Sequence, residues 1–554
     1  MKRSLFVTVA LVITASAVFA SGAQQTTAAA RPVGGPLDPY TPPLTITTWR
    51  GLSNRTYTDG QSFEDNIWTR AIERELGIRF QYVWTAPSNE FAAKINTSLA
   101  AGDFPDLLTK LNLEQYYSLA RVGRLAPMNA LLEQYDVGQV RKYLDFGEGI
   151  NRQMMTINGE IYGWGEGPSI MSGLLFAARN DWLANVGRSM PTTYDELIDV
   201  LYAFTNEDPN RSGRRDTYGL LASAAFLGGG APLEPFFALH QSYPNIWVND
   251  GGRLVFGALT PQTKEALRAL RQLQADGVMS PEWPVFGAWS EAPDEIARGR
   301  VGAAFGAEWW HNWGAVTQTV MENPGMVWEH NYPRAANGDY MKRPVTAQVT
   351  SINAMNSSFG NPEALVKLYN LHYMKTTNPA TADGNFHTIV TPDGGRVSSF
   401  FYWNDFFAAH ARDTNPVLAR AVTRAIETGD PSQLNPEAMG YYNGAREWMS
   451  GQALQVGNDG PYGNYKTFGP NGSMWLNWFM LEGGHVLVDA FQGAPTRAQA
   501  QFAGDLRSMR DELFIQMIVG ELDLDAGWNQ WLRYWENNGG REWTEQVNEW
   551  HRTR

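Results

Sequence analysis

The sequence predicts an α/β fold, because strand patterns and helix patterns alternate along it. Residues 44–49 and 78–83 are β-branched or alternating runs, which are typical of strands. Between them, apolar residues recur at helical spacing from Phe63 to Leu76, and Gly77 follows as a helix stop. This alternation favours a mostly parallel sheet, and 554 residues are enough for two or more domains.

The same alternation continues further along the chain. Residues 174–178 form an apolar strand pattern, and Thr193 with Glu196 forms a capping box that opens the next helix. Pro261 begins a further helix pattern, in which leucines recur on one face. From about Thr496 the pattern is mainly helical, so we expect a helical C-terminal region.

The N-terminal residues predict export. Met1-Lys2-Arg3 is a basic start, and an apolar run with small residues at 18 and 20 follows it, which is typical of a secretory signal peptide cleaved near Ala20. Residues 21–43 are rich in Ala, Thr, Gly and Pro, so we expect a flexible leader. The sequence contains no cysteine, hence no disulfide and no site for a lipid anchor. We therefore expect a soluble periplasmic or secreted protein.

The composition narrows the class of ligand. A formal net charge of −13 disfavours nucleic acid and anionic membranes as partners. The chain has 21 tryptophans, an abundance that favours aromatic platforms for a ligand. Sugars suit such platforms, because their C–H faces stack on rings while their hydroxyls form hydrogen bonds.

One short stretch concentrates these features. Residues 300–305 form an apolar strand pattern, and Glu308, Trp309, Trp310, His311 and Trp313 follow directly after it. Ligands of open α/β folds bind at the carboxyl ends of strands, so this stretch is a candidate site. Packing in the core is the alternative for each indole, because Trp is usually buried.

Four segments resemble the type 1 extracellular solute-binding proteins of sugar ABC transporters. They read Leu-Ala-Ala-Gly-Asp-Phe-Pro-Asp at 99–106, Asn-Gly-Glu-Ile-Tyr-Gly at 158–163, Arg-Asn-Asp-Trp-Leu with Pro-Thr-Thr-Tyr-Asp-Glu-Leu between 179 and 197, and Asp-Glu-Ile-Ala-Arg-Gly-Arg-Val-Gly at 294–302. Their order and spacing carry the resemblance, which covers most of the chain after about Leu44. Size and the helical tail are most similar to the large LplA and alginate-binding subgroup.

The resemblance implies a two-lobed periplasmic-binding-protein fold of type II, with discontinuous lobes joined by hinge crossings. The N-terminal lobe would comprise residues 44–165 plus 348–400, and the C-terminal lobe residues 167–347 plus 401–554. Such a protein captures an oligosaccharide between its lobes and delivers it to the membrane permease of an ABC transporter. The resemblance also implies a monomer that requires no cofactor.

Candidate ligand residues lie where this two-lobed arrangement places strand ends and crossings. The aromatic and polar candidates are Trp49, Arg50, Asp106, Trp164, Glu308, Trp309, Trp310, Arg334, Tyr402, Trp403 and Asn404. For each of them a core or surface role is the alternative. Trp475 and Trp478 could extend the site or pack the C-terminal helices, and Trp313 is the indole of the central stretch that we assign to the core.

Residues 208–216 resemble a calcium-binding loop. Asp208, Asn210, Ser212 and Asp216 supply oxygens at loop positions one, three, five and nine, Arg214 would contribute its backbone carbonyl, and glycine occupies position six. Three arginines among only two certain carboxylates weaken cation binding. The sequence therefore leaves open a structural calcium site or a metal-free turn closed by its own side chains.

A secreted glycoside hydrolase, or another carbohydrate-active enzyme, is the competing function. It would need two positioned carboxyl groups, for which Glu308 with Asp106 or Glu166 could be imagined. The sequence contains no nucleophile elbow, zinc-protease helix or phosphate loop. We therefore favour a non-enzymatic receptor.

Overall fold

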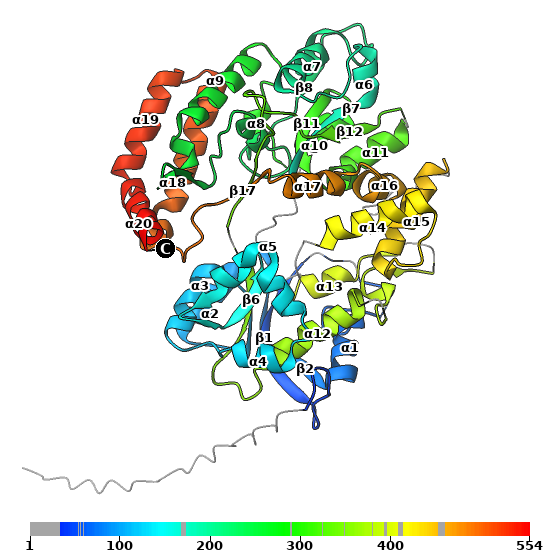
Figure 1. Cartoon of the computed structure of the whole chain (residues 1–554), viewed down its shortest axis with the longest axis vertical. Helices are drawn as coiled ribbons and strands as arrows, with labels where there is room; N and C mark the ends of the chain where they lie inside the picture. The colour runs from blue at the N-terminus through cyan, green and yellow to red at the C-terminus, as the bar shows by residue number, and fades with distance from the viewer. Residues whose placement is uncertain are drawn as a thin grey trace, which may run out of the picture.

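The computed structural model describes residues 34–553 except for 54, 56, 59, 168–172, 289–290, 324, 348, 379, 393–395, 408–413 and 452–459. The described chain forms two bodies, each with its own sheet and its own hydrophobic core (Figure 1). We call the lower body of Figure 1 the N-lobe and the upper body the C-lobe. This arrangement confirms the predicted α/β class.

The N-lobe is built on a five-stranded sheet of order β2-β1-β3-β14-β6. The strands are β1 (Leu44–Leu52), β2 (Ile78–Pro87), β3 (Leu107–Leu111), β14 (Thr350–Met355) and β6 (Gly163–Glu166). β1 pairs in parallel with both β2 and β3, whereas β14 runs antiparallel to β3 and to β6. β1, β3 and β6 therefore end at the same edge of the sheet.

Helices cover this sheet and complete its core. They are α1 (Ile67–Leu76), α2 (Ser88–Ala101), α3 (Leu113–Arg121), α4 (Asn129–Tyr135), α5 (Gln139–Met155), α12 (Ala364–Thr376) and α13 (Phe400–Asn404). The short pair β4 (Thr156–Ile157) and β5 (Glu160–Ile161) follows α5, and η4 (Gly384–Phe386) with the pair β15 (Ile389–Val390) and β16 (Arg396–Val397) leads to α13. Gly77 ends α1 in the left-handed conformation, with φ of 64°, as the sequence predicted.

The C-lobe sheet has the order β12-β7-β11-β8. Its strands are β7 (Leu174–Arg179), β8 (Tyr218–Leu220), β11 (Val301–Ala307) and β12 (Trp328–Asn331), and a separate hairpin pairs β9 (Trp247–Asp250) with β10 (Arg253–Phe256). β11 is parallel to β8 and antiparallel to β7. The end of β11 and the start of β7 therefore share one edge of the sheet.

Helices from two distant parts of the chain surround the C-lobe sheet. The first set is α6 (Asn180–Asn185), α7 (Tyr194–Asn206), α8 (Glu234–Leu239), α9 (Pro261–Ala275), α10 (Glu291–Ala297) and α11 (Gly314–Glu322), with the 3-10 turns η1 (Gly257–Leu259), η2 (Trp283–Val285) and η3 (Trp310–Asn312). The second set is α18 (Arg497–Val519), α19 (Leu524–Asn537) and α20 (Gly540–Arg552), which lie beside α9 (Figure 1). The predicted helical C-terminal region is confirmed.

These C-terminal helices account for part of the tryptophan content. Trp531, Trp535 and Trp543 are buried, and Trp535 stacks on Phe256 with ring centroids 5.0 Å apart. An aromatic cluster of this kind stabilises a large core that has no disulfides. The abundance of tryptophan is therefore partly structural and does not by itself indicate ligand platforms.

A helical segment follows the last N-lobe residues in the sequence and precedes the C-terminal helices of the C-lobe. It contacts both lobes. It consists of α14 (Thr414–Thr428), α15 (Pro436–Met449), α16 (Pro461–Phe468) and α17 (Ser473–Glu482). On the N-lobe side, His387 lies 3.3 Å from the carboxylate of Glu437 on α15. On the C-lobe side, Asn312 donates a 2.9 Å hydrogen bond to Thr467 of α16. After α17, β17 (Val486–Val488) pairs in parallel with β13 (Arg343–Val345).

Two expectations about segment boundaries are wrong. The predicted flexible leader, 21–43, ends within the folded body, because Tyr40 is buried and donates a 2.8 Å hydrogen bond to Glu363. The N-lobe core continues past the predicted boundary at residue 400, since Trp403 and Phe407 belong to it. The predicted signal peptide, 1–20, lies outside the described residues, and within them no helix has the length and apolarity to span a membrane.

Candidate functional site

The edge at which β1, β3 and β6 end gathers charged groups of the N-lobe. Arg55, in the loop after β1, forms two hydrogen bonds of 2.9 and 3.1 Å with Asp405, which follows α13. Lys110 lies near the end of β3, and Glu166 is the last residue of β6. Because these strands are parallel, the side chains that follow them converge on one face.

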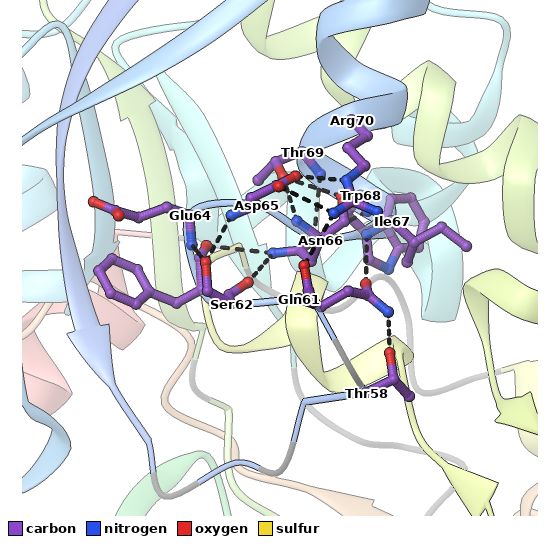
Figure 2. A network of polar contacts seen from close by, with 12 residues as sticks. Thr58, Gln61, Ser62, Glu64, Asp65, Asn66, Ile67, Trp68, Thr69 and Arg70 are labelled. Atoms are coloured by element: carbon purple, nitrogen blue, oxygen red, sulfur yellow. Dashed lines mark hydrogen bonds and ion pairs between the residues drawn. The ribbon is translucent and has the colours of Figure 1, made fainter. Parts of the chain in front are cut away.

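The loop that carries Arg55 is anchored to the start of α1 (Figure 2). Gln61 accepts a 2.8 Å hydrogen bond from the backbone of Ile67, and Asn66 forms a capping box with Thr69. A capping box satisfies backbone donors that the first turn of a helix leaves unpaired. These contacts hold Gln61 and Ser62 against the start of α1, and the ion pair with Asp405 holds Arg55 beside α13.

The corresponding edge of the C-lobe is formed where β11 ends. Glu308 is 4% exposed and accepts a 3.1 Å hydrogen bond from the backbone of Gly173. Its carbonyl accepts a 2.6 Å hydrogen bond from Ser473, the first residue of α17. Tyr332 donates a 2.5 Å hydrogen bond to Asn477, also on α17. These bonds fix α17 against the strand ends.

The outer face of α17 carries an aromatic row. Trp475 and Phe479 are 36% and 37% exposed, unusually high for such large apolar side chains. Trp478 lies on the same face by helical spacing but is partly buried, because it packs against Val345 and Arg420 lies over its ring at 4.5 Å. We call these three residues the aromatic ledge. In Figure 1, α17 lies along the border of the C-lobe that is turned towards the N-lobe.

Trp309 is the exposed indole of the stretch after β11. It is 36% exposed, and its ring meets Phe468 edge-on with centroids 5.6 Å apart. The bond between Ser473 and the Glu308 carbonyl brings the start of α17 to this position. Trp309 therefore lies near the N-terminal end of the aromatic ledge.

A small pocket opens at the start of β7. Its cavity volume is about 120 Å³, which is below the usual range of small-molecule sites, so it would hold no more than one group of a larger ligand. Its lining consists of Gly173, Leu174, Glu234, Pro235, Ala238, Met341, Arg343 and Pro344. Glu234 accepts a 2.8 Å hydrogen bond from Asn245, and burial raises the pKa of its carboxyl above the usual value. The pocket thus offers a carboxyl group and a guanidinium group on an otherwise apolar wall.

Most predicted ligand residues of the N-lobe belong to its core, and those expectations are wrong. Trp49 is fully buried and donates a 3.0 Å hydrogen bond to the carbonyl of Thr109. Arg50 is 2% exposed, lies 5.0 Å from the Phe406 ring centroid and donates to the carbonyl of Tyr402. Trp164, Tyr402 and Trp403 are also buried in this core. The strand ends were correctly located, but these side chains point into the lobe.

Two of the three remaining polar candidates, Asp106 and Arg334, have structural partners, and the side-chain oxygen of Asn404 is buried without a hydrogen-bond partner among the described residues. Asp106 accepts hydrogen bonds from the backbone and the hydroxyl of Thr47, at 2.9 and 2.6 Å. The guanidinium of Arg334 stacks on Tyr340 at 4.1 Å. Asn404 is partly buried at the end of α13. Arg334 is nevertheless close to the aromatic ledge, because the Tyr340 ring on which it stacks meets Phe479 with centroids 5.7 Å apart.

Trp310 is also a core residue, which contradicts its prediction as a ligand platform. It is 5% exposed, and its ring packs against Trp313 and Trp328 with centroid distances of 5.1 and 5.5 Å. Trp313 packs against the same core, as expected. Of the three indoles in this stretch, Trp309 is the most exposed.

The sequence analysis left out several residues that the structure places at these edges. Trp475 and Trp478 were noted but not chosen, and Phe479, Glu234 and Lys110 were not considered. Residues 475, 478 and 479 are spaced so that they form an apolar stripe on one helix face, and this pattern is visible in the sequence. A stripe of this kind usually packs inward, and only the tertiary structure shows that it does not.

The loop 208–216 folds as a compact turn around its polar side chains. Asp208 accepts hydrogen bonds from the backbones of Ser212 and Gly213, at 2.9 and 3.0 Å. Asp216 accepts 3.0 Å bonds from the side chains of Asn210 and Ser212. Within the described residues, no group of three or more His, Cys, Asp and Glu side chains is arranged to hold a metal ion.

A buried histidine pair joins β12, η3 and α16. The His330 Nε2 donates to the carbonyl of Asn471 at 3.2 Å, so its Nδ1 accepts from His311 Nε2, and His311 Nδ1 faces the Tyr462 hydroxyl at 3.2 Å. This chain of bonds requires the His330 ring to be neutral, because its Nδ1 accepts a hydrogen bond. Burial, followed by the charge of Lys466, lowers the pKa of His330 to about 4, and burial with the neighbouring ring lowers that of His311 well below its usual value.

A family of known proteins matches the chain over residues 54–366, and it is described as bacterial extracellular solute-binding protein. The match spans more than half of the chain. The chain belongs to this family. This confirms the resemblance inferred from the ordered sequence motifs.

Curated relatives match a smaller part of the chain. Lipoprotein LipO of Bacillus subtilis is 26% identical over 237 residues, 42% of this chain and 45% of LipO. The polygalacturonan/rhamnogalacturonan-binding protein YtcQ of B. subtilis is 24% identical over 43% of this chain and 46% of YtcQ. The fructooligosaccharide-transporter protein FusA of Streptococcus pneumoniae is 28% identical over 38% of this chain and 41% of FusA. The chain thus matches less than half the length of these relatives.

Solved structures support the fold across nearly the whole chain. The alginate-binding protein AlgQ2, solved without calcium ion, superposes with a TM-score of 0.58 at 16% identity and covers 94% of this chain and 100% of its own. FusA of S. pneumoniae, in complex with kestose, also gives 0.58, at 18% identity over 92% of this chain and 99% of its own. At these identities, the likeness establishes the fold alone.

We predict opposite consequences for two tryptophan substitutions. Trp310→Ala should lower the free energy of unfolding by about 3–5 kcal/mol, because it leaves a cavity between buried rings. Trp475→Ala should lower it by less than about 1 kcal/mol, because one face of that ring already meets solvent. Urea denaturation of both variants measures this, and equal losses would contradict the assignment of Trp475 to an exposed ledge.

We predict that acid destabilises the protein through the histidine pair. Folding lowers the pKa of His330 to about 4, so the unfolded chain, whose histidines titrate near 6.5, binds more protons between these values. The neutral ring therefore makes its full contribution to the free energy of unfolding above pH 6.5. This contribution falls by about 2–3 kcal/mol as the pH is lowered towards 4.

The measurement compares the free energy of unfolding at pH 7 and pH 4.5. His330→Gln should reduce the loss between these values, while His551→Gln, on the last helix, should leave it unchanged. An identical pH dependence in all three proteins would contradict the role assigned to the pair.

Proposed function

We propose that this protein is an exported receptor that binds an oligosaccharide between its lobes and delivers it to the permease of an ABC transporter. The main observation that supports this proposal is the aromatic ledge. Its residues Trp475 and Phe479 are exposed, and they belong to α17, which runs along the border of the C-lobe that is turned towards the N-lobe. Exposed rings are costly in water, so their presence favours a ligand that stacks on them.

Sugar rings fit the chemistry of this ledge. Each stacked aromatic contact contributes about 0.5–1.5 kcal/mol beyond area burial, so a few contacts supply much of a micromolar affinity. The nearby pocket offers Glu234 and Arg343 for hydrogen bonds to hydroxyl groups. A ligand that touches both lobes stabilises their closed arrangement, which is the state that a transporter could recognise.

The described carboxyl groups support a receptor rather than a glycosidase. A glycosidase needs two carboxyl groups that flank the bond to be cleaved. Glu308 is buried and bonded to Gly173, and Asp106 accepts both bonds from Thr47. Neither is presented to a substrate as an acid or a base. Release of the mature chain without a lipid anchor, and function as a monomer, are parts of the same proposal.

Calorimetry with a panel of neutral and acidic oligosaccharides tests this function, with a product assay on the same samples. We expect binding without turnover. Trp475→Ala should weaken binding by about 3–10-fold through loss of one stacked ring, whereas Trp475→Phe should retain most of the affinity. Cleavage of any bound glycan would contradict the receptor function, and so would a failure to bind every saccharide.

We also propose that the loop 208–216 holds a structural calcium ion with low affinity. Asp208, Asn210, Ser212 and Asp216, with the Arg214 carbonyl, would supply the oxygens. One of the FusA structures is described as an EF-hand mutant, which concerns that protein. The arginines around the loop oppose a cation, so millimolar calcium should be required.

Thermal unfolding with 5 mM calcium against a chelator tests the loop. Binding to the folded state alone should raise the melting temperature by about 1–3 °C. Asp208→Asn should remove this increment, and Asp195→Asn, the same charge change on exposed α7, should preserve it. No increment in the unaltered protein would show that the loop closes through its own hydrogen bonds.

A further inference from the structure

Lys110 holds an unusual backbone position at the edge where the N-lobe strands end. Its φ is 55°, in the left-handed region, which costs a residue other than glycine about 1–2 kcal/mol. Ser351, on the neighbouring strand β14, has φ of 51°. Strained backbone of this kind is concentrated at ligand sites, so both strands are bent where a ligand could approach.

The bend at Lys110 is held by a buried side chain. Asn353 accepts a 3.3 Å hydrogen bond from the Lys110 backbone and donates a 2.8 Å bond to the Tyr369 hydroxyl. Asn353 and Tyr369 are both buried. The position of Lys110 is therefore set by β14 and α12 together, which pre-organises its side chain.

The Lys110 ammonium group lacks a direct acceptor. The side chain is largely buried, and desolvation lowers its pKa despite the opposing charges of Asp405 and Glu166. Among the residues that the structure describes, no carboxylate forms an ion pair with it and no oxygen accepts a hydrogen bond from it. By contrast, Arg55 pairs directly with Asp405.

The charges around Lys110 have a positive balance. The groups that act on it electrostatically are Arg50, Arg55, Asp405 and Glu166, so with Lys110 itself three cations face two carboxylates. Arg50 donates hydrogen bonds to neutral oxygens, those of Tyr82 and Tyr402. Such a positive site is conspicuous in a chain whose formal net charge is −13.

We propose, building on saccharide binding as the function, that Lys110 binds an anionic substituent of the ligand, a uronic-acid carboxylate or a sulfate ester. A half-buried ammonium group is costly without an acceptor, and a charged acceptor compensates it better than a neutral hydroxyl does. Lys110 is then the residue that selects acidic over neutral saccharides. The aromatic ledge would bind the sugar rings without regard to charge.

Calorimetry with three matched ligands tests this proposal. The probes are uronic-acid oligosaccharides, the same oligosaccharides methyl-esterified at their carboxyls, and sulfated oligosaccharides of equal length. The unaltered protein should bind an acid at least about 30-fold more tightly than the corresponding ester. Binding of the uronate identifies the carboxylate as the partner, and binding of the sulfated probe alone identifies the sulfate.

Variants connect this selectivity to Lys110. Lys110→Gln should abolish the difference between acid and ester by weakening the binding of the acid, and Lys110→Arg should preserve the preference. Lys94→Gln, the same charge change on exposed α2, should have no effect on it. Melting curves of each variant show whether a loss of ligand affinity is caused by unfolding of the protein.

The outcomes separate this proposal from the function on which it rests. Equal affinity for acid and ester, or a preference that survives in Lys110→Gln, overturns the role of Lys110 and leaves the receptor function in place. Binding of neutral saccharides alone would likewise overturn the role of Lys110 and leave the receptor function in place. Failure to bind any saccharide overturns both.

Discussion

The docking of α17 on the strand ends of the C-lobe is the constraint on which the candidate site depends. Ser473 bonds to the Glu308 carbonyl and Asn477 to Tyr332, so the polar groups of the inner face are paired. Because that face of the helix is buried, helical geometry turns Trp475 and Phe479 towards solvent, while Trp478 between them packs partly against Val345. Burial on one side of the helix therefore creates the apolar ledge on the other.

The two lobes contribute different chemistry to the proposed site. The C-lobe supplies rings and a small pocket, which suit the apolar faces and the hydroxyls of sugars. The N-lobe supplies charges, with Arg55 paired to Asp405 and Lys110 unpaired among the described residues. If one lobe supplies affinity and the other selectivity, a ligand gains the most binding free energy when it contacts both lobes. Ligand binding then favours the closed arrangement of the lobes.

The helical segment α14–α17 links these contributions, because it contacts both lobes. It meets the C-lobe through Asn312 and through the buried His311–His330 pair, and it meets the N-lobe through His387 and Glu437. The neutral pair needs every ring nitrogen to be bonded, since a charged imidazole in this position would be poorly solvated. We therefore expect the attachment of α16 to the C-lobe to weaken in acid.

The sequence by itself determined the fold class, the family and the strand ends at which the site lies, because these follow from periodicity and from the order of local motifs. The outcome for each ring was decided by tertiary structure. Trp309 and Trp310 are adjacent, yet one is exposed and the other packs on Trp328, which comes from another strand. Likewise Trp403 filled the N-lobe core, while Trp475 was left outside by contacts of α17 with distant residues. Burial depends on what the rest of the chain places over a residue, and no local pattern contains that information.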